Sequence, residues 1–576
     1  MDYKSYIAKK LNIDGVSFDD VYSSIAIPPD NSMGDFALPC FKFAKALRKS
    51  PIMIAEDLQK NYEVDDVIVK VIAVNGYLNF TVNRTSMAGK VLEEILSKKE
   101  NYGSSNIGEG KTICIDYSSI NIAKPFHIGH LSTTVIGSAL YKIYKKLGYN
   151  VVGINHLGDY GTQFGKLIYA YKAWGNREEV EKGRVKELMR LYVKFHDEAE
   201  KDSSLEDKAR EYFKLIENGD KECNELFKWF KDLTLIDVEK VYRDLDVTFD
   251  SYAGESFFND KMQPVIDELQ EKGLLVESNG AKIVNLDEYD MPPCLILRSD
   301  GASLYATRDL AAAVYRNKEY NFHKCLYVVA YQQNLHFKQF FKVLELMGKP
   351  WAKDMVHVAF GMVSLEEGTM STRKGKVVFL EDVINKCCEK ALNIIDEKNP
   401  DLENKEETSK AVGVGAVIFG ALSSSRIKDI VFSYYKVLNF DGETGPYCQY
   451  TYARCASVIR KGGEVFDFDK NYTPNEDEYT LLQLLEKYGE VLNMAADRYE
   501  PSMITRYAVE LSSAFNKFYF DCKILGEEET VKNYRLALTM ATKIVLKNAL
   551  SMLGIKTPEK MWYEKVNYFW FRWHTP

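Results

Sequence analysis

Short apolar runs alternate with longer amphipathic segments through the middle of the chain. Alternation of this kind is typical of α/β domains, in which helices connect the parallel strands of one sheet. Five short runs have the length and the apolar content of buried strands. These candidate strands are Thr112–Asp116, Val151–Asn155, Cys294–Leu297, Cys325–Val329 and Val356–Phe360.

Two other stretches have a helical pattern. The segment from about 174 to 246 is highly charged and has no strand signal, which predicts a helical insertion in the α/β block. Beyond the polar run 398–410 the pattern is helical nearly to the end. Thr473-Pro474-Asn475-Glu476 predicts a helix start, with Thr473 and Glu476 as a capping box. One continuous apolar face is expected to follow, made of Leu481, Leu484, Leu485, Tyr488 and Leu492.

These patterns divide the chain into three blocks and a tail. Residues 1–105 mix short helical and strand patterns and end in a stretch rich in Gly and Ser, which predicts a small α+β domain and a linker. Residues 106–400 form the α/β block, with the insertion placed at about 174–290. Residues 401–561 are predicted to be all helical, and 562–576 form an aromatic tail of unknown role.

Composition and charge exclude several classes of protein. The chain has 576 residues, of which 46% are hydrophobic and 27% charged, a mix typical of globular domains. The longest uncharged apolar run, 411–422, is shorter than the ~20 residues of a membrane span. The ten cysteines form no Cys-x-x-Cys motif, which indicates reduced thiols and a cytoplasmic protein. The net charge of −8 argues against nucleic-acid binding by bulk electrostatics but leaves a local basic face open.

The most informative motif is His127-Ile-Gly-His130. It follows the strand at 112–116 and a loop, and it opens a helix expected over about 129–147. A helix N-terminus offers free N–H groups and the positive end of a dipole, so it attracts phosphate. Two imidazoles add donors, and Gly129 lets a phosphate approach the backbone closely. Taken alone, the motif could also be two structural histidines on a helix turn.

A second candidate is the loop Met370-Ser-Thr-Arg-Lys-Gly375, which follows the predicted strand at 356–360. A loop with Ser, Arg and Lys suits the clamping of a triphosphate whose charge moves during reaction. A solvated surface loop is the alternative interpretation.

Polar side chains also follow other strands of the α/β block. They lie in Gly158–Gly165, in Tyr305–Asp309, and at Gln333 and His336. Ligands of open α/β sheets bind at the carboxyl ends of the strands, so these segments predict one shared site. Asp309 alone could instead complement a helix dipole.

These motifs together resemble a known family. His127-Ile-Gly-His130 is the HIGH signature of class I aminoacyl-tRNA synthetases. Ser119–Pro125, Gly158–Gly165, the loop at 370–375 and Leu438–Tyr447 are similar to arginyl-tRNA synthetases in particular, and the resemblance spans about residues 20–561. It implies a Rossmann-type catalytic domain with a helical insertion, an all-helical anticodon-binding domain and an N-terminal domain that contacts the tRNA corner.

The resemblance also implies a reaction and its partners. Arginine and ATP would form arginyl-adenylate, generally only with tRNA bound, and arginine would then pass to the 3′ end of tRNA(Arg), releasing AMP. The expected partners are tRNA(Arg), L-arginine and ATP with Mg²⁺ as a substrate complex. No protein-bound metal is expected, and the family is usually monomeric.

The resemblance further assigns residues to roles. His127, His130, Lys124 and Lys374 would be catalytic, and ATP would contact His127, Gly129, His130, Met370, Ser371, Arg373 and Lys374. Arginine would contact Asp116, Asn121, His130, Tyr305, Asp309 and Gln333. Transfer RNA would contact Asn79, Tyr447, Tyr450 and Arg454.

The sequence departs from the family pattern at several positions. Thr369 and Thr372 occupy the lysine positions of the KMSKS signature, and Lys124 is the expected replacement for the missing lysine. Tyr160 replaces a usual Trp, and Ser132 stands where Arg is common. The tail after Met561 extends beyond the usual end of the family.

Three alternatives are weighed against this interpretation. A cysteinyl-tRNA synthetase would carry zinc ligands, and a nucleotidyltransferase would be much shorter. A synthetase-like RNA-binding scaffold would have lost active-site residues that this chain keeps. ATP–pyrophosphate exchange with and without tRNA would distinguish them.

Overall fold

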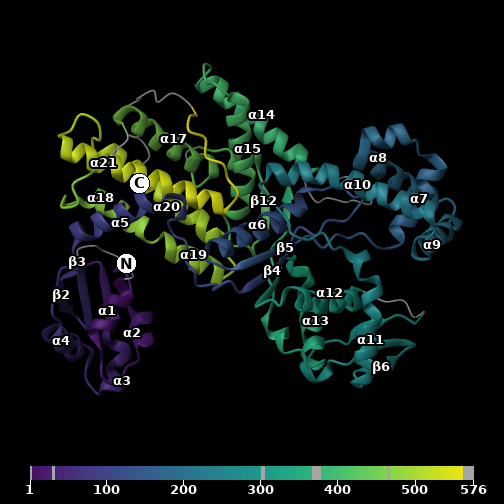
Figure 1. Ribbon diagram of the computed structural model, residues 1–576, viewed down its shortest axis with the longest axis horizontal. Coiled ribbons are helices and arrows are strands. Elements are labelled where there is room, and N and C mark those ends of the chain that lie inside the picture. The colour runs from purple at the N-terminus through teal and green to yellow at the C-terminus, as the bar shows by residue number, and fades with distance from the viewer. Residues whose placement is uncertain are drawn as a thin grey trace. The chain divides into compact units, whose positions relative to one another are not determined.

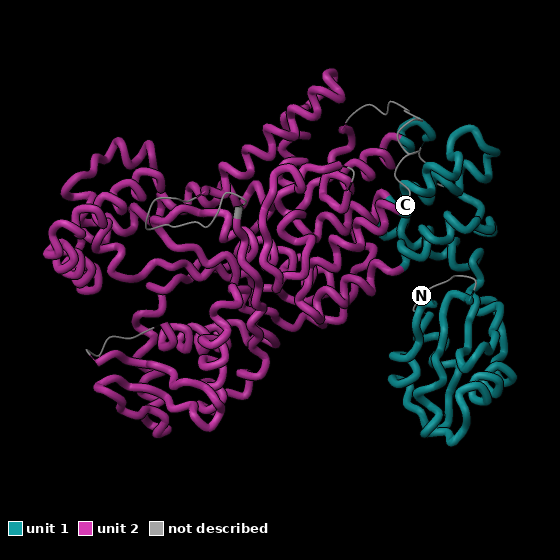
Figure 2. The backbone as a smooth tube through the Cα atoms, turned by 180° about the vertical axis from the view of Figure 1, so that it is seen from behind, with its two compact units in different colours: residues 1–99, 458–486, 514–542 teal, residues 100–457, 487–513, 543–576 magenta. Residues whose placement is uncertain are grey.

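The computed structural model describes residues 3–28, 33–299, 305–365, 378–440, 442–463 and 467–561 (Figure 1). The predicted loop residues Met370, Ser371, Arg373 and Lys374, and the tail after Met561, lie outside these ranges. The chain divides into two compact units (Figure 2). Unit 1 comprises residues 1–99, 458–486 and 514–542, and unit 2 comprises 100–457, 487–513 and 543–576.

Unit 2 is built on a parallel sheet of four strands in the order β10-β9-β4-β5. The strands are β4 (Thr112–Asp116), β5 (Asn150–Ile154), β9 (Lys324–Tyr327) and β10 (Met355–His357), which confirms four of the five predictions. The chain order reverses between the neighbours β4 and β9. The crevice at such a switch point, outside the carboxyl ends of the strands, is where open α/β sheets bind ligands.

The fifth predicted strand belongs to a different sheet. β8 (Cys294–Leu297) pairs antiparallel with β7 (Ala281–Val284), which pairs with β6 (Leu275–Ser278). The prediction that β8 joins the parallel sheet is therefore wrong. Asn279-Gly280, with φ of 52° and 79°, closes a β6–β7 hairpin, and this local turn provides the partner for β8.

Helix α6 (Leu131–Lys146) follows the HIGH motif and packs against β4 and β5. A Cβ added at Gly137 of α6 would lie 2.2 Å from Cγ of Tyr117, the residue after β4. The absent side chain therefore lets α6 approach the end of the strand closely. Within 174–246 the structure describes helices and no strand, as predicted, whereas the stretch up to 290, which the prediction includes in the insertion, also contains the strands β6 and β7. The helices of this region are α8 (Arg177–Ala199), α9 (Ser204–Glu217) and α10 (Lys221–Asp244), and α7 (Thr162–Trp174) precedes them.

The remaining elements of unit 2 complete its layers. Helix α12 (Tyr305–Tyr320) and helix α13 (Asn334–Leu346) pack into the buried cluster of the sheet through Leu310, Ala313, Phe337 and Phe340. Two short strands, β11 (Val363–Leu365) and β12 (Ile430–Phe432), pair in parallel. Other helices are α11 (Met262–Glu271), α14 (Leu380–Lys398), α15 (Lys405–Leu422), α16 (Tyr434–Val437) and α17 (Gly445–Gly462), of which the residues after 457 belong to unit 1.

Helix α18 (Glu476–Glu486) begins with a different capping box from the one predicted. Asn475 Oδ1 accepts a hydrogen bond from Glu478 N at 2.9 Å, and Glu478 Oε2 accepts one from Asn475 N at 2.8 Å. The assignment to Thr473 and Glu476 is therefore wrong by two residues. The expected single helix face also ends early, because a new helix, α19 (Tyr488–Asp497), starts after Lys487. Helices α20 (Ser502–Asp521) and α21 (Glu529–Met552) follow.

Unit 1 contains an antiparallel sheet with the order β1-β3-β2. Its strands are β1 (Phe36–Pro39), β2 (Ile68–Val74) and β3 (Tyr77–Val82), accompanied by α1 (Tyr3–Leu11), α2 (Phe18–Ser24), α3 (Ala44–Leu47), α4 (Pro51–Asn61) and α5 (Arg84–Lys98). Asn79 lies half-buried on β3. Among the helices of the described residues, none is long and apolar enough to cross a membrane.

Candidate functional site

The HIGH motif forms one tight turn, η4 (Ile128–His130), at the start of α6. His127 Nδ1 accepts a hydrogen bond from Gly129 N at 3.0 Å, and His130 Nδ1 accepts one from His127 N at 3.2 Å. The two ring centroids are 4.0 Å apart. Because each Nδ1 is an acceptor, each neutral ring carries its proton on Nε2. The turn therefore fixes two imidazoles whose Nε2–H groups are available as donors.

Burial keeps both imidazoles neutral. It lowers the pKa of His127, and it lowers the pKa of His130 to about 3, with smaller contributions from the charges of His127 and Lys124. At neutral pH the rings are consequently hydrogen-bond donors and not cations or proton carriers. Neutral donors suit the phosphate oxygens of ATP, because the total charge of these oxygens changes little during the reaction while its distribution among them shifts.

The loop that leads into the HIGH turn has an unusual backbone. Ser118, Ser119 and Ala123 have φ of 68°, 43° and 58°, in the left-handed region that side chains disfavour. Ser118 N donates to Thr133 Oγ1 at 3.0 Å, and Ala123 N donates to Thr234 Oγ1 at 3.1 Å. Such conformations persist where the surroundings hold them, and they concentrate at functional sites.

The same loop presents Asn121 and Lys124. Gly158 N donates to Ile120 O at 2.8 Å, and Ile122 N donates to Gly158 O at 3.1 Å, so Gly158 brackets the exposed Asn121. A Cβ on Gly158 would lie 2.5 Å from Asn121 Oδ1, so only glycine fits beside the carboxamide in this arrangement. Lys124 is half-buried and close enough to His130 to help lower its pKa.

The described residues that follow the predicted phosphate loop border the HIGH turn. Ile128 N donates to Val378 O at 3.2 Å, and Leu380 N donates to Phe126 O at 2.9 Å. His127 and Phe379 form an antiparallel bridge between them. The chain after 377 is thus held directly against the start of the HIGH turn, at His127.

The candidate amino-acid pocket lies at the start of α12 and after β9. Tyr305 and Asp309 stand on the first turns of α12, and Tyr305 is 70% exposed. Gln333 ends the turn η7 (Tyr331–Gln333). Asp309 Oδ2 lies 2.6 Å from His336 Nε2. The structure therefore brings Asp309 and His336 together, as the expectation of a shared site requires.

Glu255 is a further candidate for the site, which sequence reasoning missed. Its pKa is raised to about 7, mainly by burial and to a smaller extent by the charges of Asp309 and Asp159, against the opposing guanidinium of Arg308. A carboxyl group destabilised in its charged form by neighbouring carboxylates is typical of a pocket built for a cation. No local signal marks Glu255 in the sequence, because its neighbours come from distant segments.

Asp116 is already engaged inside the protein. Its carboxylate accepts hydrogen bonds from Arg316 Nη2 at 2.7 Å and from Ser119 Oγ at 2.6 Å, and both Asp116 and Arg316 are buried. The geometry places Asp116 under the site as a residue that holds α12 and the HIGH loop. The expectation of a direct contact between Asp116 and arginine gains no support from this arrangement.

The residues predicted to contact the anticodon side lie on one face of α17. The guanidinium of Arg454 lies 4.7 Å from the ring centroid of Tyr450, and Tyr447 OH lies 3.2 Å from Ser513 Oγ. All three predicted residues are half-buried.

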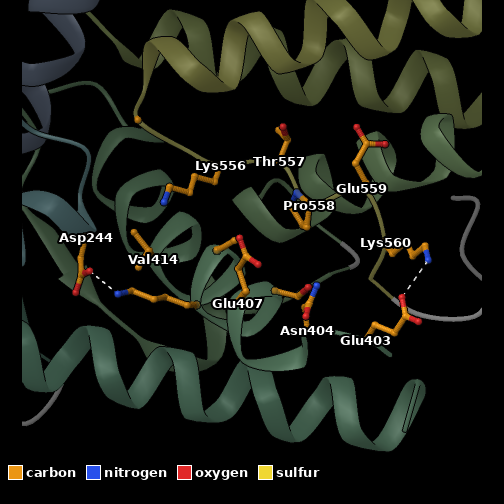
Figure 3. Close-up of a pocket in the computed structure, with 14 residues that line it drawn as sticks. Asp244, Glu403, Asn404, Glu407, Val414, Lys556, Thr557, Pro558, Glu559 and Lys560 are labelled. Carbon is orange, nitrogen blue, oxygen red and sulfur yellow. Dashed lines mark ion pairs between the residues drawn. The ribbon is translucent and has the colours of Figure 1, made fainter. Parts of the chain in front are cut away.

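A separate pocket of about 540 Å³ lies between α15, the end of α10 and the segment 554–560 (Figure 3). Lys410 pairs with Asp244 at 2.5 Å, and Lys560 pairs with Glu403 at 3.7 Å. The predicted site residues are not among those that line this pocket. In the described part of the chain, no group of three or more His, Cys, Asp or Glu side chains could hold a metal ion.

Three families match successive parts of the chain. Residues 1–82 match "Arginyl tRNA synthetase N terminal domain", residues 91–434 match "tRNA synthetases class I (R), catalytic domain", and residues 448–561 match "DALR anticodon binding domain".

Curated relatives cover nearly the whole chain. An arginine–tRNA ligase of Clostridioides difficile is 54% identical over 564 residues, which is 97% of this chain and 100% of the relative. One of Halothermothrix orenii is 53% identical over 565 residues, with the same coverage.

Two solved structures share the fold. Thermus thermophilus arginyl-tRNA synthetase has a TM-score of 0.80 at 24% identity, covering 93% of this chain and 96% of its own. Arginyl-tRNA synthetase from Plasmodium falciparum has a TM-score of 0.78 at 22% identity, and the match covers 97% of this chain and 98% of that protein's chain.

Proposed function

The chain belongs to the arginyl-tRNA synthetase family, and from this premise we propose how its residues divide the work of charging tRNA(Arg). The protein is an arginine–tRNA ligase, as the resemblance of its motifs predicted. The arginine carboxylate attacks the α-phosphorus of ATP and pyrophosphate leaves, giving arginyl-adenylate. The terminal ribose hydroxyl of tRNA then attacks the activated carbonyl, and AMP leaves. Neither step needs a protein nucleophile, so positioning and charge stabilisation supply the catalysis.

We assign the phosphates of ATP to the HIGH turn. The reciprocal hydrogen bonds of His127 and His130 are the observation that carries this assignment, because they leave two fixed Nε2–H donors at the switch point of the sheet. The N–H of Gly129 already donates to His127 Nδ1. We therefore propose that Gly129 acts by letting a phosphate approach the backbone closely. Lys124 supplies positive charge beside the histidines, and the loop residues Met370, Ser371, Arg373 and Lys374 hold the leaving pyrophosphate. Mg²⁺ arrives with ATP as part of the substrate.

We assign the guanidinium of arginine to the carboxylates of Asp309 and Glu255. A guanidinium has five donors and a permanent charge, so it needs acceptors of opposite charge. Tyr305 and Gln333 supply further polar contacts, and Asn121 with His130 faces the carboxylate end of the substrate. In the free protein His336 bonds to Asp309 and keeps that carboxylate oriented.

We assign the tRNA to both units. Tyr447, Tyr450 and Arg454 offer aromatic and guanidinium planes on which unpaired anticodon bases stack. Asn79 on β3 contacts the corner of the tRNA.

We also propose that the protein works as a cytoplasmic monomer.

Incorporation of labelled arginine into tRNA tests the proposal, with ATP–pyrophosphate exchange measured with and without tRNA. Charging with arginine and exchange that requires tRNA are expected. The matched variant is His130→Gln, which keeps a donor but loses the ring. If His130→Ala, which removes the donor, turned over like the unchanged protein, the assignment of the phosphates to the HIGH turn would be wrong, although charging itself would still identify the enzyme.

A further inference from the structure

We propose that Tyr160 is a positioning residue of the arginine pocket, whose ring holds the guanidinium of Arg308 and so keeps it from occupying Glu255 in place of the substrate. This inference rests on the proposed function and deepens it. Tyr160 lies in the segment that follows β5, and its side chain is half-buried. Its ring contacts α12, its hydroxyl contacts α9, and its backbone N–H bonds to Glu255.

Arg308 carries the same charged group as the substrate. It precedes Asp309 on α12 and is only 5% exposed, and its Nε has no hydrogen-bond partner among the described residues. A buried guanidinium is normally paired with a carboxylate. Arg308 lies near enough to Glu255 for its charge to lower the pKa of that group, yet no ion pair joins these two described side chains. Arg308 is therefore a competitor of the substrate guanidinium within the protein itself.

The ring of Tyr160 is the partner that the structure provides for Arg308. Arg308 Cζ lies 4.2 Å from the centroid of the Tyr160 ring, inside the limit of about 6 Å for a cation–π interaction. Such an interaction is stronger when the cation is removed from water, as Arg308 is. A ring stabilises the cation without using a carboxylate, so Glu255 and Asp309 keep their oxygens for the substrate.

Helix α9 fixes the ring that holds Arg308. The hydroxyl of Tyr160 donates a hydrogen bond to Glu217 Oε1, and its ring meets that of Phe213 edge-on, with centroids 5.1 Å apart. Burial, and to a smaller extent Glu217, raises the pKa of Tyr160, so the hydroxyl remains a donor at neutral pH. Rotation of the ring away from Arg308 would break both contacts with α9. The helical insertion thereby helps to shape the arginine pocket.

The backbone of Tyr160 orients the carboxyl group that the ring protects. The N–H of Tyr160 hydrogen-bonds to the carboxylate of Glu255. In the other direction Glu255 N donates to Leu157 O at 2.9 Å, three residues before Tyr160. Glu255 is thus held against the segment after β5 by both its backbone and its side chain.

The charged groups that face Glu255 leave Arg308 as the decisive cation. Burial has the largest effect on the pKa of Glu255 and raises it, and the charges of Asp309 and Asp159 act in the same direction. Lys231, whose Nζ lies 2.7 Å from Asp159 Oδ2, is already engaged by that carboxylate. The position of Arg308 therefore decides whether Glu255 is free for a second guanidinium.

The test varies the ring and the cation separately. Tyr160→Leu removes the ring, Tyr160→Phe removes only the hydroxyl, and Tyr160→Trp keeps an aromatic face. Arg308→Met removes the cation, alone and together with Tyr160→Leu. The matched control is Tyr289→Leu, because the exposed ring of Tyr289 also lies near a cation, with its centroid 4.7 Å from Lys342 Nζ, outside the residues assigned to arginine. Aminoacylation gives kcat and the KM for arginine from about pH 6 to 8, and thermal unfolding checks that each variant is folded.

At about pH 8, where Glu255 is charged, Tyr160→Leu should raise the KM for arginine about tenfold, because the released Arg308 pairs with Glu255. The KM for ATP should stay within about twofold. An adjacent opposite charge lowers the pKa of a carboxyl group by about 1–3, so the fall of kcat/KM below pH 7 should move to lower pH. Tyr160→Phe should raise the KM for arginine about threefold, since it loses one hydrogen bond. Tyr160→Trp and Tyr289→Leu should leave it unchanged.

The double variant distinguishes competition from packing. Without the cation the ring has nothing to hold, so Tyr160→Leu should have little further effect on the KM for arginine when Arg308→Met is present. Arg308→Met alone should move the fall of kcat/KM to higher pH, because it removes a charge that lowers the pKa of Glu255. A ring that only filled space would instead raise the KM by the same factor with and without Arg308.

Three results would overturn the inference. A normal KM for arginine in Tyr160→Leu would remove Tyr160 from the pocket. A raised KM with an unmoved pH profile, and with the same factor in the absence of Arg308, would give the ring a packing role only. A KM of Arg308→Met at pH 8 as high as that of Asp309→Ala would make Arg308 a required part of the pocket and not a competitor. Loss of arginine charging in the unchanged protein and in Tyr289→Leu would instead overturn the proposed function, and the inference with it.

Discussion

Arg316 Nη2 lies 2.7 Å from Asp116 Oδ2 in a buried ion pair that joins α12 to the end of β4. Asp116 is the last residue of β4, and Ser119 of the HIGH loop bonds to the same carboxylate. Arg316 belongs to α12, the helix whose first turns carry Tyr305 and Asp309. The pair therefore fixes the distance between the proposed arginine pocket and the loop that leads to the proposed phosphate site.

Substitutions of Asp116 and Arg316 should distinguish the effect of this ion pair on folding stability from its effect on the position of α12. Asp116→Asn leaves a buried guanidinium without its counter-charge and should cost about 3–5 kcal/mol of stability. Asp116→Leu with Arg316→Met should recover most of that stability, because apolar pairs often replace buried ion pairs without loss. The double variant should still raise the KM for arginine about tenfold or more, since a shift of α12 misplaces Asp309. Thermal unfolding and steady-state kinetics provide the readouts, and a stable double variant with normal KM would show that the pair is structural only.

Asp309→Ala should raise the KM for arginine by about 10- to 150-fold, because a charged hydrogen-bonding partner of a guanidinium is worth about 1.5–3 kcal/mol. The KM for ATP should stay within about twofold, since the phosphates contact other residues. Asp232→Ala, an exposed position on α10, is the control. Saturation kinetics with each substrate varied in turn measure both constants. A variant that keeps its KM for arginine would remove Asp309 from the pocket.

The raised pKa of Glu255 predicts a pH dependence of arginine use. With a pKa of about 7, this carboxyl group is neutral below pH 7 and charged above it, so its attraction for a guanidinium is lost as the pH falls. The kcat/KM for arginine should therefore fall below pH 7 by up to about tenfold per pH unit, as kcat/KM reports groups of the free enzyme. The HIGH histidines do not contribute to this fall in kcat/KM, because burial lowers the pKa of both and they are already neutral at pH 7.

Glu255→Gln isolates that group. This variant should have a low kcat/KM for arginine at every pH from 6 to 8, without the fall below pH 7. The profile is measured at subsaturating arginine with tRNA and ATP in excess. A Glu255→Gln enzyme that keeps the fall would assign the titration to another residue.

Local features of the site were predictable from the sequence, and its long-range partners were not. The strand β4 and the start of α6 follow from short-range patterns, and the HIGH residues lie within four positions of one another. Glu255 could not be found this way, because its pKa depends on burial and on carboxylates from other segments. The resemblance assigns Asp116 to the substrate, and the ion pair with Arg316, 200 residues away, has no local signal in the sequence.

The wrong predictions about the fold have the same physical origin, namely partners that the local sequence does not reveal. Apolar content identifies β8 as a strand but says nothing of its neighbour, which the β6–β7 hairpin determines. At the start of α18 the sequence allows two capping boxes. Glu478 settles the choice, because it bonds to Arg535 Nε at 2.7 Å from a distant helix as well as to Asn475.

Removing one HIGH imidazole should slow the chemistry more than binding. His130→Ala deletes a fixed donor and also the acceptor of His127 N–H, so kcat should fall by about 10²–10³, the usual effect of losing one preorganised donor. The KM for arginine should rise less than kcat falls, because Asp309 and Glu255 still bind the guanidinium. Pre-steady-state formation of pyrophosphate in the presence of tRNA measures the step directly. A normal rate of pyrophosphate formation would mean that His130 has only a structural role.

Lys124→Ala should also lower kcat by about 10²–10³, because the KMSKS lysine positions hold Thr369 and Thr372 and another cation is needed beside the phosphates. The left-handed backbone at Ala123 fixes the direction in which Lys124 leaves the loop, so Lys124→Arg should recover only part of the rate. Lys111→Ala, an exposed lysine just before β4, is the matched control. The measurement is single-turnover aminoacylation at saturating arginine and ATP. Near-normal turnover of Lys124→Ala, followed by loss of activity when Lys374→Ala is added, would transfer the role to the loop at 370–375.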